Sequence, residues 1–341
     1  MKTPFKNLKT INMKNPTISR RKFLGTAATA AAAISVVPFS HSFGIATDTK
    51  KPNSKVNGVQ LGLTTYSYRS IPHLADEVLQ YILKAGVNAV EMRSVLEESL
   101  GLPQAPGRLA PGVVLTDKEK ADRANAAANL KETQRKWRLS LPMQKYADMR
   151  KMYNKAGVDM HIAKFVPSTW SDEEIDYAYN AAKVLGAYGI TDECSEAACK
   201  RLGTFAEKHK SLAIYHTHQQ FAEPGFDIEK LLAYSPANRL NLDAGHYYGA
   251  TGLHPNNIIE KYHHLIPMIH MKDKTGPKSD PPATNMPFGK GETPIKDILL
   301  LIKKEKWPID VFVELEYNIP EGSDPVKEVT KCIEYMRGIL E

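Results

Sequence analysis

Short apolar runs rich in β-branched residues alternate with longer amphipathic segments from Val59 to the end of the chain. The short runs predict strands, and the amphipathic segments predict helices. Eight strands are predicted in this way: Val59–Tyr68, Val87–Met92, Val158–Val166, Tyr188–Glu193, Leu212–Thr217, Leu240–Asp243, Met268–Lys272 and Val311–Glu316. Eight regular strand–helix repeats in one chain favour a (β/α)8 barrel, the α/β TIM-barrel fold, over an open, doubly wound sheet.

Capping residues mark several of the helices between these strands. Ser171, with Glu174 three residues later, predicts a helix over Asp172–Leu185. The other helices are expected at Leu74–Lys84, Glu196–His209 and near 227–234, 255–263, 294–305 and 324–339. The stretch 93–157 is too long for one barrel helix. It predicts a helical insertion after the second strand, with helices near 117–137 and 142–156, that covers part of the barrel mouth.

The first 44 residues have the character of a targeting segment. They hold seven Lys or Arg residues and no Asp or Glu, which accounts for the net charge of +7 of the whole chain. Ser19-Arg20-Arg21-Lys22-Phe23-Leu24 precedes an apolar run, Thr26 to Phe39, that is too short to span a bilayer. The run resembles a bacterial twin-arginine signal, so we expect export machinery as a partner and a periplasmic or otherwise exported protein. An ordinary secretory signal and an uncleaved anchor are the alternatives.

These features divide the chain into a signal peptide (1–44), a polar linker (45–57) and a single barrel domain (58–341). Without the leader the chain is close to neutral, which argues against nucleic acid as a partner. The three cysteines, Cys194, Cys199 and Cys332, are too few for a disulfide framework. We expect free, buried thiols, with Cys194 and Cys199 on one helix.

Acidic and imidazole side chains stand at six of the eight predicted strand ends. They are Glu91, Asp192, Glu193, His216, His218, Asp243, His246, His270, Asp273, Glu314 and Glu316, with Lys272 among them. The carboxyl ends of barrel strands form the active site in this fold. Burying so many charges there costs several kcal/mol each unless a counter-charge is present. One divalent metal ion (Mn, Mg, Co or Zn) is the simplest counter-charge, because carboxylates and imidazoles are its natural ligands.

Residue spacing along the strands supports a common site. Glu314 and Glu316 are two residues apart, and so are His216 and His218, so each pair points to one face of its strand. The apolar residues of the opposite parity, Val311, Val313 and Leu315, must pack against helices. The glutamates are therefore expected to point into the barrel.

Five motifs resemble the sugar phosphate isomerase/epimerase group of xylose-isomerase-like TIM barrels. They are Val90–Arg93, Tyr215–His218, Leu242–His246, Ile269–Asp273 and Val313–Glu316. The resemblance implies one metal ion held by Glu, Asp, His and Glu, matched here by Asp243, His270 and Glu314. Glu193 is our choice for the fourth ligand, because strand five carries His218 and Gln220 where some members have Glu. The resemblance also places His246 and Glu91 against the substrate.

The expected activity is that of a metal-dependent isomerase or epimerase acting on a sugar or keto-sugar by proton abstraction next to a carbonyl. The catalytic candidates are Glu314 or Glu193 as base, with His246 and Lys272 acting on oxygen. The residues expected to contact the carbohydrate are Glu91, His216, His218, His246 and Glu316. A dehydratase, lyase or hydratase acting on a keto-glycoside or cyclitol is the first alternative, and a non-catalytic carbohydrate-binding barrel is the second. An abasic-site endonuclease is disfavoured by the neutral charge and the leader. Export favours an unphosphorylated sugar, and the oligomeric state stays open.

Overall fold

Eight parallel strands close into a barrel. The computed structural model describes residues 51–93, 95–107 and 115–341. The barrel strands are β2 (Val59–Thr64), β3 (Ala89–Met92), β4 (Asp159–Ala163), β5 (Gly189–Glu193), β6 (Leu212–His216), β7 (Asn238–Asp243), β8 (Met268–Met271) and β11 (Asp310–Val313). Each pairs in parallel with the next, and β2 pairs with both β3 and β11, so no barrel edge is left open. The predicted (β/α)8 barrel is confirmed.

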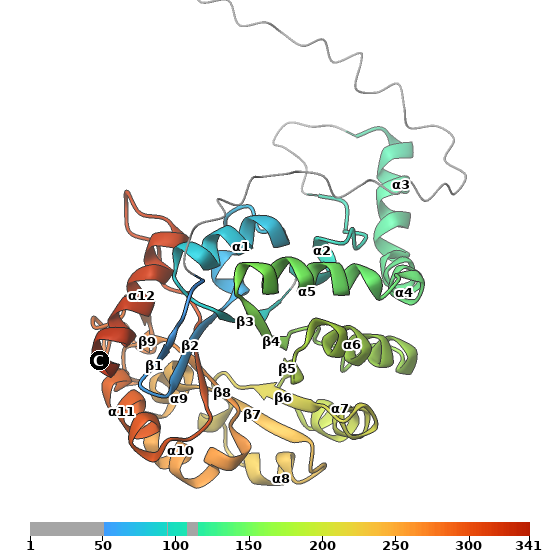
Figure 1. Ribbon diagram of the computed structural model, residues 1–341. Coiled ribbons are helices and arrows are strands. Elements are labelled where there is room, and N and C mark those ends of the chain that lie inside the picture. Colours follow the sequence, from blue (N-terminus) through green and yellow to red (C-terminus); the bar gives the residue numbers. More distant parts are fainter. Residues whose placement is uncertain (1–50, 94, 108–114) are drawn as a thin grey trace, which may run out of the picture. The chain divides into compact units, whose positions relative to one another are not determined.

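Helices surround the barrel (Figure 1). They are α1 (Ala75–Lys84), α2 (Val95–Glu98), α3 (Asp117–Ala128), α4 (Leu130–Ser140), α5 (Gln144–Ala156), α6 (Asp172–Leu185), α7 (Glu196–His209), α8 (Ile228–Leu232), α9 (Ala244–Thr251), α10 (Asn256–Tyr262), α11 (Ile295–Glu305) and α12 (Pro325–Leu340). In the part of the chain that the structure describes, the short 3-10 helices η2 (Thr65–Tyr68), η3 (Gln220–Ala222) and η4 (His263–Leu265) complete the connections. Within the described residues, no helix has both the length and the apolar character needed to span a membrane.

Three local predictions differ from the structure. The first strand ends at Thr64, and the chain then turns into η2. The predicted helix over 117–137 is divided into α3 and α4 at Asn129. The sequence also missed α9, whose two glycines weaken its helical pattern. This helix begins directly after β7, where Asp243 caps it by accepting a hydrogen bond from the amide of His246 at 2.7 Å.

The described part of the expected linker belongs to the folded unit of the barrel. Lys55–Val56 forms β1, which pairs antiparallel with β2. Ser54 is fully buried, and its hydroxyl lies 2.7 Å from Asn88 Oδ1. The polar composition of 45–57 therefore misled the prediction for residues 51–57, because buried hydrogen bonds compensate these polar groups. The predicted leader, 1–44, lies outside the described residues.

An apolar layer fills the barrel interior below the site. Ala89, Ile162, Ile214, Met268 and Phe312 form this inner cluster, and each is fully buried. A Cβ atom at Gly62 would collide with the Phe312 ring, so this glycine leaves the space that the ring fills. These five apolar side chains fill this layer of the barrel. The inward-pointing residues nearer the carboxyl ends of the strands lie outside the layer, and there polar side chains can form a site.

A buried ion cluster attaches the insertion between β3 and β4. Arg138 of α4 donates to Glu97 of α2 (Nε to Oε1, 2.8 Å) and to Glu174 of α6 (Nη1 to Oε1, 2.9 Å). Its guanidinium also stacks 3.6 Å from the ring of Trp170. By contrast, α3 buries no side chain. The insertion is therefore fixed to α6 through α2 and α4.

Replacing Arg138 by Met should lower the free energy of unfolding by about 3–5 kcal/mol, because two buried carboxylates lose their counter-charge. Urea denaturation followed by circular dichroism measures this loss. Arg135→Met is the matched control, because Arg135 pairs with exposed glutamates at 3.8–3.9 Å. Such surface pairs contribute at most about 1 kcal/mol. Equal losses for the two variants would contradict the stabilising role of the Arg138 cluster.

Candidate active site

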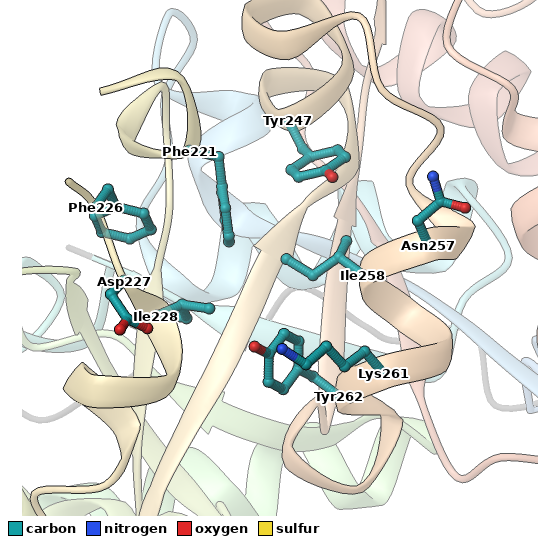
Figure 2. A pocket seen from close by; sticks show the side chains of 9 residues that line it. All are labelled: Phe221, Phe226, Asp227, Ile228, Tyr247, Asn257, Ile258, Lys261 and Tyr262. Carbon is teal, nitrogen blue, oxygen red and sulfur yellow. The ribbon is translucent and has the colours of Figure 1, made fainter. Parts of the chain in front are cut away.

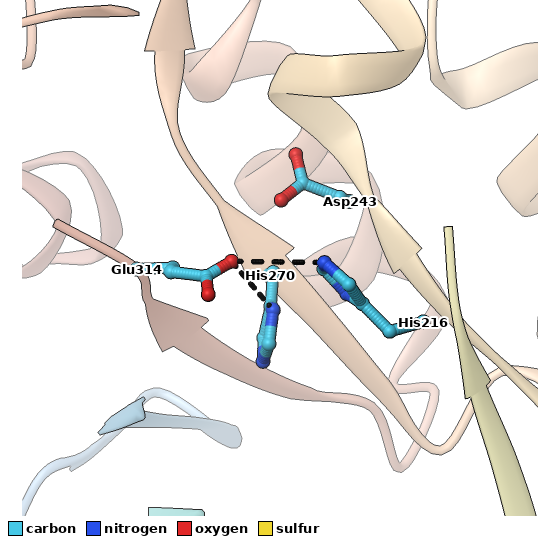
Figure 3. Close-up of side chains that lie close together, drawn as sticks. All are labelled: His216, Asp243, His270 and Glu314. Carbon is cyan, nitrogen blue, oxygen red and sulfur yellow. Dashed lines mark hydrogen bonds and ion pairs between the residues drawn. The ribbon is translucent and has the colours of Figure 1, made fainter. Parts of the chain in front are cut away.

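Four polar side chains converge above the apolar layer (Figure 3). His216 and Asp243 end β6 and β7, His270 is the next-to-last residue of β8, and Glu314 directly follows β11. All four are buried, and one potential ligand atom from each lies within 4.8 Å of the others. We call these four residues the buried quartet. Three of them are predicted metal ligands, and the fourth, His216, had been expected to contact the substrate.

His270 lies between two carboxylates. Its Nδ1 is 3.0 Å from Glu314 Oε2, and its Nε2 is 2.7 Å from Glu91 Oε2. Burial opposes the charged imidazole, but the two glutamates outweigh it and raise the pKa of His270 to about 10. Glu91 is fully buried against His270. It therefore orients this imidazole, in contrast to the substrate-facing position expected from the sequence.

His216 is a neutral imidazole. Burial, reinforced by the charge of Lys164, lowers the pKa of His216 well below its ordinary value. Its Nδ1 has no hydrogen-bond partner among the described residues, and its Nε2 lies 3.8 Å from Glu314 Oε2. Because a metal ion binds the unprotonated imidazole, this side chain is already in the form of a ligand.

The Lys272 ammonium is surrounded by carboxylates. Its Nζ lies 3.0 Å from Asp243 Oδ2, 2.9 Å from Glu314 Oε2 and 2.6 Å from Glu316 Oε2. Burial alone would lower the pKa of Lys272, but these carboxylates raise it above the ordinary value. Burial lowers the pKa of His246 to about 4, so neutral His246 accepts a hydrogen bond from Lys272 at 2.8 Å. Lys272 is thus the resident cation of the site, and the two glutamates after β11 both point to it.

Glu193 lies at the more open side of the site. Its side chain is 40% exposed, and its two oxygens contact Lys164 Nζ at 3.0 Å and His218 Nε2 at 3.0 Å. Although burial opposes ionisation, the bond from His218 and the charge of Lys164 lower the pKa of Glu193 to about 2. Glu193 groups with His216 and His218 and is not a member of the buried quartet. The buried quartet therefore contains His216 in addition to the three matched ligands, and Glu193, the predicted fourth ligand, lies in the adjoining group.

Two contributors to the site escaped the sequence reading. Lys164 is buried just beyond β4, two residues after the inner-core residue Ile162. Asn241 is also buried, and its Nδ2 lies 3.2 Å from His270 Nε2. The available signal was the two-residue period of each strand, which puts both on the inner face. A single polar residue within an apolar strand run, such as Lys164 or Asn241, should also have been considered a candidate for the site.

A pocket at the surface is separate from this site (Figure 2). It is lined by Phe221, Phe226, Asp227, Ile228, Tyr247, Asn257, Ile258, Lys261 and Tyr262. No residue predicted for the site lines it. The Tyr247 ring packs edge-on against Phe221 at 5.1 Å.

The buried quartet could bind a metal ion. It supplies two imidazoles and two carboxylates, a donor set that Zn, Co and Mn accept and that suits Mg less well. Asp243 Oδ2 is buried and accepts no hydrogen bond from the described residues, although the Lys272 charge is 3.0 Å away. One oxygen is therefore available to a ligand. Glu91 completes the carboxylate–imidazole arrangement that commonly supports a metal-bound histidine.

Comparison with known proteins identifies the fold. No protein-family model matches the chain, and no curated protein matches it. A solved sugar phosphate isomerase/epimerase from Parabacteroides distasonis is 17% identical, with a TM-score of 0.55 over 89% of this chain and 100% of that chain. D-psicose 3-epimerase is 12% identical (TM-score 0.55, 83% of this chain and 99% of that chain). A probable 3-DHS dehydratase from Bacillus anthracis is 11% identical (TM-score 0.52, 81% and 98%). At these identities the likeness establishes the xylose-isomerase-like barrel fold alone.

Proposed function

We propose that the protein is a metal-dependent sugar isomerase or epimerase that abstracts a proton next to a carbonyl. The observation that carries this proposal is the buried quartet beside Glu193, an ionised and accessible carboxylate. A cation site next to an ionised base is the arrangement needed to remove a proton from carbon. Solved structures with this fold include a D-psicose 3-epimerase, which supports a carbohydrate as the substrate.

His216, Asp243, His270 and Glu314 would hold the divalent ion. When bound, the ion supplies Lewis-acid polarisation of a substrate oxygen. A ligand imidazole must be unprotonated, so ion binding requires His270 to lose the proton that its Nδ1 now shares with Glu314. Glu91 remains on the opposite nitrogen and holds the ring in place.

Glu193 takes the proton from the substrate carbon. Lys164 and His218 fix its two oxygens, and its low pKa keeps it ionised at neutral pH. Return of the proton from Glu193 to the neighbouring carbon gives an isomer, whereas an epimer requires a second group to donate a proton to the opposite face of the same carbon while Glu193 keeps the one it removed. Because the side chain is partly exposed, it can reach a substrate that enters from the barrel mouth.

Lys272 stabilises negative charge that develops on a substrate oxygen. Its ammonium is held by Glu316 and His246, so it is already oriented before substrate arrives. A protonated group in this position could also assist departure of a hydroxyl or glycosyl group. This feature, together with the fold shared with a probable dehydratase, makes elimination from a keto-glycoside or cyclitol the second candidate reaction.

We also propose that the protein is exported through its twin-arginine-like leader, which lies outside the described residues. Changing Arg20 and Arg21 together to Lys should leave most of the protein in the cytoplasm, because this address is read by a receptor. Cell fractionation and immunoblotting measure the distribution. Lys14→Gln is the control, because it removes a leader charge outside the arginine motif. Normal export of the double variant would favour the ordinary secretory route.

Glu91→Gln should weaken metal binding by about 10- to 100-fold, because His270 loses the carboxylate that orients it. Calorimetric titration of chelator-treated protein with Mn²⁺ and Zn²⁺ measures the affinity. Glu316→Gln serves as the control, because Glu316 contacts Lys272 and does not belong to the buried quartet. Unchanged affinity in both Glu91→Gln and His270→Ala would place the metal elsewhere.

Glu193→Gln should slow exchange of solvent deuterium into a keto-sugar by about 10²- to 10⁴-fold, the usual contribution of a general base. NMR on a panel of keto-sugars follows the exchange, and chelation should abolish it in the unaltered protein. The metal content of Glu193→Gln should stay the same, which separates a base from a ligand. Glu196→Gln, an exposed change at the start of α7, is the control. Deuterium exchange in the absence of metal, or an undiminished exchange rate in Glu193→Gln, would refute this mechanism. Release of a hydroxyl or glycosyl group from the substrate would instead identify a lyase.

A further inference from the structure

Two arginines stack on one tyrosine where β2 and β3 end. The Cζ atoms of Arg69 and Arg93 lie 4.4 Å and 4.1 Å from the centre of the Tyr66 ring. Neither guanidinium forms an ion pair with a carboxylate in the described part of the chain. Arg69 donates only to main-chain oxygens, those of Tyr66 (3.1 Å) and Leu315 (2.8 Å). The pair therefore carries two positive charges without an internal counter-charge.

This arginine pair adjoins the candidate active site. Arg93 is two residues beyond Glu91, so the period of the strand puts it on the same face, one step nearer the carboxyl end. Arg69 is bonded to Leu315, the residue between the two glutamates that contact Lys272. Arg69 is exposed, and Arg93 and Tyr66 are half-buried, so all three can meet a molecule at the mouth.

Charge divides the rim into two parts. At the ends of β4 and β8, Lys164 and Lys272 are both neutralised by glutamates or aspartate. On the side of β2 and β3, the two arginines lack such partners among the described residues. A guanidinium that stacks on a ring keeps its in-plane N–H groups available, and these match the two oxygens of a carboxylate or phosphate. Stacking also fixes the side chain, so less conformational entropy is lost on binding.

We propose that Arg93 and Arg69, supported by Tyr66, form an anion subsite that binds a carboxylate or phosphate group of the carbohydrate substrate. The inference rests on the proposed function, because it assumes that the reacting end of the same molecule lies at the buried quartet. The substrate class is then an acidic sugar, held by its anionic group at β2 and β3 and by its carbonyl end at β6 to β11. Export would favour the carboxylate over the phosphate ester.

The test compares three probes of similar size: D-glucuronate, D-glucose 6-phosphate and neutral D-glucose. Their dissociation constants are measured by ligand-observed NMR on chelator-treated protein, so that no turnover is needed. Charge-assisted hydrogen bonds should make at least one anionic probe bind ten- to a hundredfold more tightly than glucose. Tighter binding of glucuronate identifies a carboxylate subsite, and tighter binding of glucose 6-phosphate identifies a phosphate subsite.

Arg93→Met should reduce this preference to nearly one, and Arg93→Lys should retain part of it, because the charge stays while the paired donors are lost. Arg150→Met is the matched control: Arg150 also donates to a main-chain oxygen, that of Val184, but lies on α5. Circular dichroism verifies that each variant is folded. Equal binding of all three probes, no measurable binding of either anion at millimolar concentration, or an undiminished preference in Arg93→Met would overturn the proposal. If the unaltered protein prefers an anionic probe but shows no metal-dependent deuterium exchange, only the proposed reaction is refuted.

Discussion

The Lys272 ammonium, which follows β8, contacts three carboxylates from β7 and from the segment after β11, the two strands that flank β8 in the sheet, and the polar end of the barrel depends on this contact. Asp243, Glu314 and Glu316 all lie within 3.0 Å of it. Without a cation there, these groups would be unpaired charges in a buried layer, at a cost of several kcal/mol each. The apolar layer below cannot supply counter-charges, since Phe312 and its neighbours fill it. The positive charge that compensates these carboxylates must therefore come from the inward-pointing side chains at the carboxyl ends of the strands. We call these side chains the polar ring.

The charges of this ring leave room for a divalent ion. Glu91, Asp243, Glu314 and Glu316 give four negative charges, and Lys272 with protonated His270 gives two positive ones, so two negative charges remain. If an ion takes the place of the His270 proton, three negative charges face two positive charges on the ion. With the ion bound, the net charge is zero if His270 keeps its proton and minus one if it loses it. Both values are closer to neutrality than the two negative charges that remain without the ion. The electrostatics thus agree with the donor set, although Lys272 competes for two of its oxygens.

Local signals in the sequence were sufficient for most of the fold. The bounds of α6 and α7 match the prediction, because Ser171 and Ser195 cap them and hydrophobic periodicity continues between the caps. The two-residue spacing of Glu314 and Glu316 predicted that they point the same way, and both contact Lys272 after β11 ends. The fourth metal ligand could not be chosen in this way. It depends on how far strand ends lie apart around a closed barrel, and strand pairing is non-local information that one sequence does not contain. The burial of Glu91 behind His270 was hidden for the same reason.

The proposed site would combine two parts of the barrel with different tasks. The quartet comes from β6, β7, β8 and the segment after β11, which are consecutive in the sheet. The unpaired arginines come from the ends of β2 and β3, and the insertion fixed by Arg138 follows β3 directly. Changes in the insertion can therefore alter what the arginine side accepts without disturbing the buried quartet, because the two sets stand on different strands. A barrel suits this division, since each loop varies while the closed sheet keeps the strand ends in register. The chemistry of the proton transfer and the choice of substrate would then be set by separate residues, the first by Glu193 and the quartet and the second by Arg93 and Arg69.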